Sequence, residues 1–461
     1  MKEQSTAAAA AANEVAINIK NIDEDLAYIF NGNRLSTRLS HQQLKLPNIP
    51  KVPKMLRNLE KNKGCFDPHV VSIGPYHHGK DHLKEVEKLK AELARQYCGR
   101  FDGLRGCDLY EKVKVVAGEA RRFYDIEPSK GVNDDQAFTK MMFLDGCFIL
   151  QFMWLLVKGE YHAMGMKNNV IANVKRDMFL LENQLPYIVL RALMKDEEDE
   201  KCWKKRIETY ITICRRLHPE VKPRWFTSPF RSSPEEKYIL HLLDMTRERF
   251  VNQSATIQCR KTQISDTNQI RSCSNEWYSY YSARVLNSMG IWFKPNKTGS
   301  FSDVKFESQL FIRGVLTLPP ILIDASTKSV LLNLLAFESS HNNSADEQGV
   351  TSYMCFMDSI IDNAEDVMIL RTQNVIVNCL GTDQQVADLF NDIASNLVPN
   401  PHTYAEAKRG IQKHCNTRFK KWMAEFLHIH FKSPWTLIAL FGSLLLITLT
   451  AVQTYFAAKP S

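Results

Sequence analysis

The sequence predicts a mainly α-helical protein with a minor β element (α+β), made of a large soluble body and one C-terminal transmembrane helix. Apolar residues recur at helical spacing through most of the chain, whereas short runs with strand character occur only between residues 290 and 324. A long apolar run without charged residues stands near the C-terminus. We therefore divide the chain into a disordered segment at 1–44, a mostly helical body at 45–431 and an anchor at 432–461.

The composition is that of a globular protein. Of 461 residues, 44% are hydrophobic and 24% are charged, which is enough apolar material for a full core. The net charge of +8 is concentrated before the C-terminal apolar run. No basic stripe with interleaved stacking aromatics occurs elsewhere, so we expect no nucleic-acid partner.

The cysteines and the N-terminus favour a cytosolic body. Eleven cysteines, an odd number, are scattered without a CxxC pair, which favours reduced thiols over a disulfide framework. Cys147, Cys355 and Cys379 lie in apolar runs, where a thiol behaves as a small hydrophobe. The alanines at 7–12 form too short and too weakly apolar a run for a signal peptide.

Helices are predicted for most of the first half of the chain. A short helix is expected at 23–30 within the otherwise disordered start. The spacing of apolar residues then predicts helices at 81–97 and 109–125, and a buried core helix at 141–157. A further helix is expected to begin near 177 and to be kinked or restarted at Pro186.

The second half mixes loops, strands and helices. Residues 195–235 are charged and then proline-rich, which predicts an exposed excursion, and 252–275 are polar, which predicts a loop. Strand character follows at 290–295, 302–307 and 314–324. Helices are expected at 328–337, 353–363, 366–377 and 383–394.

Residues Pro434 to Phe456 form the predicted membrane span. At about 1.5 Å per residue they reach about 34 Å, enough to cross a hydrocarbon core of about 30 Å. Trp435 and Tyr455 stand near its ends, where aromatic rings favour the headgroup level. The alternative is a buried core helix of a soluble domain. If these residues span a membrane, the chain contacts the lipid bilayer through residues 434–456.

The flanking charges predict the orientation of the span. In the roughly twenty residues before it lie five basic residues and one acidic residue, whereas only Lys459 follows it: Lys413, Arg418, Lys420, Lys421 and Lys432 against Glu425. The positive-inside rule then places the body in the cytosol, in a tail-anchored topology. Aromatic and basic residues just before the span form either a helix that continues out of the membrane or a segment attracted to anionic lipids: Lys420, Lys421, Trp422, Phe426, Phe431 and Lys432.

Two groups of residues are candidates for a chemical site. Cys65, His69, His77, His78 and His82 are close in sequence, but they lack the spacing that usually presents four zinc ligands, and a structured turn explains them better. We predict no metal site and no cofactor.

Two acids lie in apolar surroundings. Burial could prime Asp145 or Glu182 for general acid catalysis. Buried acids are more often satisfied by hydrogen bonds, and Glu182, Asn183 and Gln184 before Pro186 suggest a hydrogen-bonded break in the helix. Phosphate-binding and hydrolase motifs are absent from the sequence, and we predict no catalytic residue.

Nine phrases carry a family resemblance. They are PKVPKMLR (50–57), VSIGPYHHG (71–79), MMFLDGCFIL (141–150), LLENQLPYIVL (180–190), SARVLNSMGIWFK (282–294), GVLTLPPILID (314–324), FMDSIIDNAEDVMIL (356–370), CLGTDQQVADLFN (379–391) and FKSPWTLIAL (431–440). In this order the chain, from about residue 45 to its C-terminus, resembles the plant family known as domain of unknown function 247.

The resemblance implies a plant protein with a C-terminal membrane helix, and it implies no established reaction, cofactor or catalytic residue. Some members in grasses are linked to pollen-side self-incompatibility, which points toward recognition. Two positions depart from the family pattern. The usual Asp-Asp is here Asp324-Ala325, and a usual Gly is here Asn374, which tolerates left-handed backbone better than most residues.

Two functions follow as hypotheses. The first is a membrane-anchored recognition or signalling-adaptor protein, whose body binds an unidentified protein partner at the membrane surface. The alternative is an enzyme of unrecognised type that uses the buried acids or the histidine-rich turn.

Overall fold

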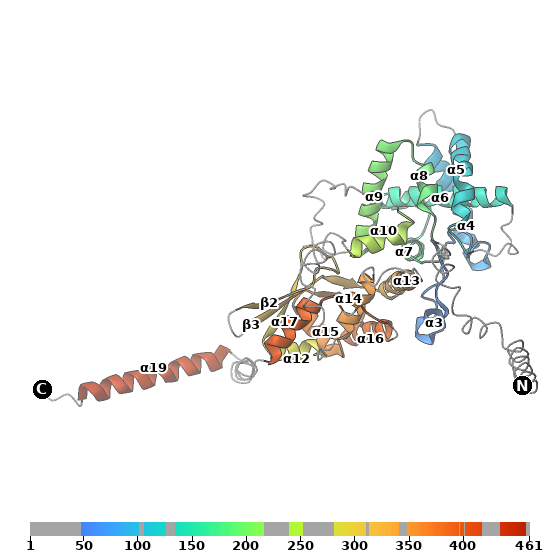
Figure 1. Cartoon of the computed structure of the whole chain (residues 1–461). Helices are drawn as coiled ribbons and strands as arrows, with labels where there is room; N and C mark the ends of the chain where they lie inside the picture. Colours follow the sequence, from blue (N-terminus) through green and yellow to red (C-terminus); the bar gives the residue numbers. More distant parts are fainter. Residues whose placement is uncertain are drawn as a thin grey trace, which may run out of the picture. The chain divides into compact units, whose positions relative to one another are not determined.

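A computed structural model describes residues 48–100, 106–125, 134–215, 239–251, 281–309, 313–340, 348–395, 397–400, 402–416 and 434–457. The predicted disorder at 1–44, the helix at 23–30 and the loop at 252–275 lie outside these residues. The described part is mainly helical with two small β-sheets, which confirms the predicted fold class for the body (Figure 1).

Helices build the first half of the body, and α4, α5, α8 and α9 contact a long helix, α6 (Figure 1). The bounds are α3 Lys54–Arg57, α4 Lys84–Cys98, α5 Gly106–Arg121, α6 Asp135–Lys158, α7 Asn168–Asp177, α8 Tyr187–Ala192, α9 Glu197–Arg215 and α10 Leu242–Phe250, with short 3-10 turns at Glu60–Asn62, Asp81–Leu83 and Tyr161–Met164. The helix predicted at 81–97 is confirmed as α4 with its preceding turn. The helix predicted at 109–125 is confirmed as α5 up to Arg121, and residues 122–125 are not helical.

The core helix predicted at 141–157 is confirmed as part of α6. The helix begins earlier because the Asp134 side chain accepts the N–H groups of Gln136 and Ala137, and it ends where Gly159 takes a left-handed conformation. By length and composition α6 could cross a membrane, but most of it is buried inside the body. It is therefore a buried core helix of the body.

The prediction of a helix from 177 through Pro186 is wrong for residues 178–186. α7 ends at Asp177, a buried non-helical turn follows, and α8 starts directly after Pro186. Asn183 and Gln184 donate their side-chain amides to backbone oxygens of the turn, which replace helical hydrogen bonds. The hydrogen-bonded break expected at 182–184 is thus confirmed.

The prediction of an exposed excursion at 195–235 is wrong for residues 197–215, which form α9. Trp203, Ile207, Tyr210 and Ile211 recur at helical spacing and are buried, and α9 contacts α6. The many charged residues on the other faces of the helix mask this stripe in the composition. Residues 216–235 lie outside the described part.

Two small sheets occupy the second half of the body. In the first, the order is β1-β3-β2, with β1 (Ile291–Pro295) parallel and β2 (Lys305–Gln309) antiparallel to β3 (Arg313–Leu318). In the second, β4 (Ile321–Ile323) pairs in parallel with β5 (Ile376–Asn378). The segments predicted to have strand character are confirmed, although 302–304 precede β2 as loop.

Helices accompany these sheets. They are α12 Ala283–Ser288, α13 Thr327–Ser340, α14 Gly349–Asp358, α15 Ala364–Thr372, α16 Asp383–Ala394 and α17 Ala405–Asn416. The helix predicted at 383–394 matches α16, and 328–337 lies within α13. The helix predicted at 353–363 is confirmed only up to Asp358, where α14 ends. α17, which contacts β2 and β3, was not predicted.

The prediction of one helix over 366–377 is wrong at its C-terminal end. α15 stops at Thr372, and Asn374 takes a left-handed conformation with φ of 59°. The chain then turns into β5 and pairs with β4. The expectation that Asn374 tolerates a left-handed turn is confirmed.

The last described helix, α19, spans Pro434–Ala457 and coincides with the predicted membrane span. Its described apolar stretch is short, Phe441–Tyr455, and no membrane is part of the structure, so crossing of a bilayer stays a prediction. The basic and aromatic residues at 420–432 lie outside the described part.

Candidate functional site

Asp145 is held by a buried polar network rather than left free. Its Oδ1 lies 2.6 Å from Lys90 Nζ, and its Oδ2 accepts the Gly74 N–H at 2.8 Å. Lys90 also contacts Glu87 Oε1 at 2.5 Å and the Ser72 carbonyl oxygen at 2.6 Å. Burial raises the pKa of Asp145, whereas Lys90 and the Gly74 N–H oppose the rise. These contacts fit a carboxylate that ties a loop to the core.

Asp177 acts in the same way on the preceding residues of that loop. Its carboxylate accepts the N–H groups of His69, Val70 and Val71 at 2.8–3.2 Å and pairs with Arg176. Asn183 accepts the Ile73 N–H at 2.7 Å. Residues 69–71 and 73 are thus anchored by side chains more than a hundred residues away in sequence, and Gly74 by Asp145, 71 residues away.

Glu182 binds two residues near the start of the body, Val52 and Arg57. Its Oε1 accepts the Val52 N–H at 2.8 Å, and its Oε2 lies 2.7 Å from Arg57 NH2. His77 Nε2 is buried 3.6 Å from the same oxygen and has no hydrogen-bond partner among the described residues. Burial, followed by the charge of Lys80, lowers the pKa of His77 to about 4.

The residues considered as metal ligands do not converge. His69 contacts Asn173, His77 contacts Lys80, and His82 contacts the Pro68 carbonyl oxygen. His78 is exposed, and burial raises the pKa of the Cys65 thiol. In the part of the chain that the structure describes, no three histidine, cysteine or acidic side chains form a metal-binding group.

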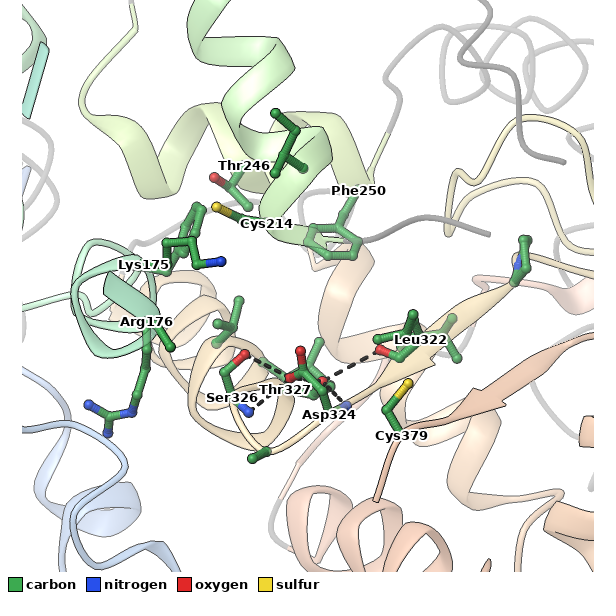
Figure 2. A pocket seen from close by; sticks show the side chains of 18 of the residues that line it. Lys175, Arg176, Cys214, Thr246, Phe250, Leu322, Asp324, Ser326, Thr327 and Cys379 are labelled. Atoms are coloured by element: carbon green, nitrogen blue, oxygen red, sulfur yellow. Dashed lines mark hydrogen bonds between the residues drawn. The ribbon is translucent and has the colours of Figure 1, made fainter. Parts of the chain in front are cut away.

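A cavity of about 410 Å³ opens between the helical half and the sheet-bearing half of the body (Figure 2). α7, α9 and α10 provide one side, and the connection from β4 into α13 provides the other. The lining residues are Ala172, Lys175, Arg176, Phe179, Ile213, Cys214, Thr246, Phe250, Phe301, Pro320, Ile321, Leu322, Asp324, Ala325, Ser326, Thr327, Val330, Leu331 and Cys379. Its size suits a small organic molecule or a few residues of a peptide.

The polar groups of this cavity come from two sides. Figure 2 shows Lys175 on one side and the Asp324, Ser326 and Thr327 turn on the other. Asp324 Oδ1 accepts from Ser326 N, Ser326 Oγ and Thr327 Oγ1 at 2.7–3.0 Å, which shapes the start of α13. Arg176 points away and binds backbone oxygens of Gly64 and Asp67.

The cavity can bind a ligand but lacks a nucleophile paired with a base among the described residues. Two thiols line it, Cys214 and Cys379, and no histidine does. Cys379, expected to behave as a small hydrophobe, is exposed, whereas Cys147 is buried as expected and Cys355 is half-buried. Neither Asp145 nor Glu182 reaches the cavity. Its arrangement fits binding of an amphipathic group, with an anionic end near Lys175.

Sequence reasoning missed several of these residues. Lys90 lies on the apolar stripe of α4 with Val86, Leu93 and Tyr97, and a lysine in that position is a signal for a buried ionic partner. Lys175 and Asp324 carry no such local signal, because the cavity is assembled from segments far apart in the sequence.

Comparison with known proteins places the chain near uncharacterised plant proteins. The family model of a plant protein of unknown function, DUF247, matches residues 49–449. A UPF0481 protein of Arabidopsis thaliana is 29% identical over 426 residues, which cover 86% of this chain and 83% of that protein. A putative UPF0481 protein of the same plant is 24% identical over 487 residues, with 88% and 89% covered. No solved structure matches.

Proposed function

The chain belongs to the DUF247 family of plant proteins of unknown function, and we propose that it is a recognition protein held at a membrane by α19. In this proposal the body lies in the cytosol and binds another protein at the membrane surface. The single observation that carries the proposal is the apolar surface of α19, which the described residues leave uncovered on every side.

The side chains of α19 are exposed on all faces of the helix. Leu444, Leu445, Leu446 and Ile447, four consecutive residues that cover a full turn, are 58–67% exposed. A partner helix covers one face, whereas a bilayer covers all of them. Burying each such side chain is worth about 1.5–3 kcal/mol, so the full helix in water would be strongly unfavourable.

The polar residues of α19 also fit a lipid environment. Thr448, Thr450 and Thr454 donate their hydroxyl groups to the carbonyl oxygens of Leu445, Leu446 and Thr450 within the helix. In lipid, polar groups need such internal partners. With 24 residues at about 1.5 Å each, α19 is about 36 Å long, which supports a single crossing.

The contacts of the buried acids support recognition over the enzyme alternative. Asp145 and Glu182 are engaged by the backbone and by Lys90 and Arg57, and the histidine-rich turn does not line the cavity. The enzyme alternative therefore draws no support from the cavity between α7 and the start of α13.

Membrane attachment is tested by extracting membranes with alkaline carbonate. We expect the full chain to stay in the pellet and a chain that ends at residue 431 to be soluble. Release of the full chain by carbonate would overturn the anchor. Protease added to sealed vesicles with the cytosolic side outward should digest the body, and a protected body would contradict the orientation.

Recognition is tested by proximity labelling in plant cells, with the anchored chain and the chain lacking 432–461 compared. We expect a reproducible set of labelled proteins that is lost without the anchor. Identical labelling by both chains would argue against recognition at a membrane. Turnover of a compound by the purified body in a metabolite screen would instead favour an enzyme.

A further inference from the structure

Trp154 of α6 makes cation–π contacts with two arginines. The guanidinium carbon of Arg100, just after α4, stands 3.4 Å from the ring centroid, and that of Arg206 on α9 stands 4.4 Å from it. Lys158, one turn along α6, places its Nζ 4.9 Å from the same ring. Three cations from three segments thus surround one half-buried aromatic side chain, which we call the Trp154 cluster.

The positive charges of the Trp154 cluster are not neutralised within the described part of the chain. No carboxylate there forms an ion pair with Arg100, Arg206 or Lys158, and the polar contact of Arg100 is a 3.4 Å hydrogen bond to Gln151 Oε1. Neighbouring arginines behave differently. On α4, Arg95 pairs with Glu92 at 2.7 Å, and on α8, Arg191 pairs with Glu200 at 3.0 Å.

Holding these charges together is electrostatically unfavourable. Burial lowers the pKa of Arg100 to about 10, and the charge of Arg206 adds to the effect. Burial also lowers the pKa of Arg206. Asp199 opposes both shifts from beyond ion-pair distance, and Glu160 opposes that of Arg100. Stacking on Trp154 offsets part of the repulsion and fixes the direction of the guanidinium groups.

We propose that the Trp154 cluster is an anion-binding site that takes a phosphate monoester carried by a protein partner. A guanidinium presents a planar fork of donors that matches phosphate oxygens, and two forks held on one ring are pre-organised for a doubly charged group. Arginine clusters are a recurring means of binding phosphorylated peptides. The site goes beyond the proposed membrane attachment, because none of its residues belongs to α19.

The surroundings favour a discrete phosphate over an anionic membrane. The first turn of α9 carries four acidic residues, Glu197, Glu198, Asp199 and Glu200. At about 1.5 Å per residue, this turn begins about 14 Å from Arg206 along the helix. A broad anionic surface would be repelled by these carboxylates, whereas a single phosphate next to basic peptide residues would gain from both charges.

The test uses the full chain in phosphatidylcholine nanodiscs. The probe is a degenerate pool of peptides carrying phosphoserine, phosphothreonine or phosphotyrosine, with its unphosphorylated twin as reference. We expect binding that depends on the phosphate and that falls at least about tenfold in Arg100→Gln and in Arg206→Gln. Arg95→Gln is the matched control, since it removes an exposed, paired arginine of α4, and should bind like the wild type.

A second measurement needs no variant. Phenylglyoxal modifies accessible guanidinium groups, and peptide mass spectrometry locates them. We expect the phosphopeptide pool to protect Arg100 and Arg206 in the wild-type chain, and inorganic phosphate at high concentration to do so partly. This readout stands even if a substitution impairs folding.

Three outcomes would overturn the site. They are equal binding of both peptide pools, unchanged affinity in both glutamine variants, and phosphopeptide binding without protection of either arginine. Binding only to vesicles that contain phosphatidylinositol phosphate would reassign the cluster to lipid. Because no arm measures membrane attachment, failure here leaves the role of α19 to be judged by carbonate extraction alone.

Discussion

Lys90 Nζ and Asp145 Oδ1 lie 2.6 Å apart, and their side chains are 1% and 2% exposed. The pair joins α4 to α6. It also fixes the loop at 72–74, which precedes α4, because Asp145 accepts from Gly74 N and Lys90 donates to Ser72 O. Attraction between such charges barely exceeds the cost of burying them, but a single unpaired charge in the same place is strongly unfavourable.

Removal of either partner of this pair should therefore destabilise the fold. We expect Lys90→Met to lower the free energy of unfolding by about 3–5 kcal/mol, because Asp145 would remain buried without its counter-charge. Asp145→Asn should also lower the melting temperature. Both are measured by urea and thermal unfolding of the detergent-solubilised chain.

The matched control for Lys90→Met is Lys84→Met on the same helix. Lys84 pairs with Asp81, but the side chains are 64% and 93% exposed. Exposed pairs are typically worth less than about 1 kcal/mol, so this variant should unfold almost like the wild type. Equal effects of the two methionine variants would contradict a structural role for the buried pair.

Stability should fall in mild acid because of His77. Its pKa is lowered to about 4 in the folded chain, against an ordinary value of 6.5. Between these values the unfolded chain binds a proton that the folded chain does not, so the free energy of unfolding decreases as pH falls through this window. The full shift corresponds to about 3 kcal/mol.

The measurement compares unfolding midpoints in urea at several pH values between 7 and 4. His77→Asn should show a shallower loss of stability than the wild type. His78→Asn, the exposed neighbour, serves as the control and should keep the wild-type slope. A slope that is the same in all three chains would exclude His77 as the cause.

Elements that are determined by interactions between residues close in sequence were predicted more accurately than those that depend on distant residues. α16 was predicted to the residue because its signals are local: Thr382 accepts the Gln385 N–H, Gln385 accepts the Thr382 N–H, and apolar residues follow at helical spacing. The turn at 178–186 was misread because apolar residues continue through it, and periodicity does not show that Asn183 and Gln184 take over the backbone hydrogen bonds.

The sites depend on distant segments. Asp177 binds backbone groups 106 to 108 positions earlier, and the cavity joins α7 to the turn after β4. No window of sequence contains such pairs. Lys90 is the exception, since its place on the apolar stripe of α4 was a local indication that it needed a buried partner.

Gly146 allows α6 and α8 to pack closely. A Cβ added there would lie 2.4 Å from Leu193 Cδ1, which would have to shift within the core, and at ordinary contact distance from Leu185 and Val189. We expect Gly146→Ala to cost about 1–3 kcal/mol through overpacking, despite the better helix propensity of alanine. Gly118→Ala in α5 meets no atom within 4 Å and should instead be neutral or stabilising by up to about 1 kcal/mol. The same loss in both variants, measured by thermal unfolding, would contradict this account.

Asn374 joins α15 to β5 with a φ of 59°. We expect Asn374→Gly to preserve or slightly raise stability, because glycine adopts this conformation without a steric penalty. Asn374→Ala should cost about 1 kcal/mol or more, since a Cβ is strained there and the asparagine side chain is lost. The order glycine, asparagine, alanine in melting temperature is the expected result, and an alanine variant as stable as the glycine variant would contradict it.

If α19 lies in lipid, a lysine should have different effects at two exposed apolar side chains, one on α19 and one on the body. Leu446 lies near the middle of α19 and is 64% exposed, and Val115 on α5 of the body is 84% exposed. A lysine at the centre of a membrane helix costs about 3 kcal/mol, so Leu446→Lys should sharply lower the carbonate-resistant fraction. A second substitution, Leu445→Lys, should remove what remains. Val115→Lys adds the same charge at a site already in water and should leave both membrane retention and stability unchanged. Full retention of the double lysine variant would mean that something other than lipid covers α19.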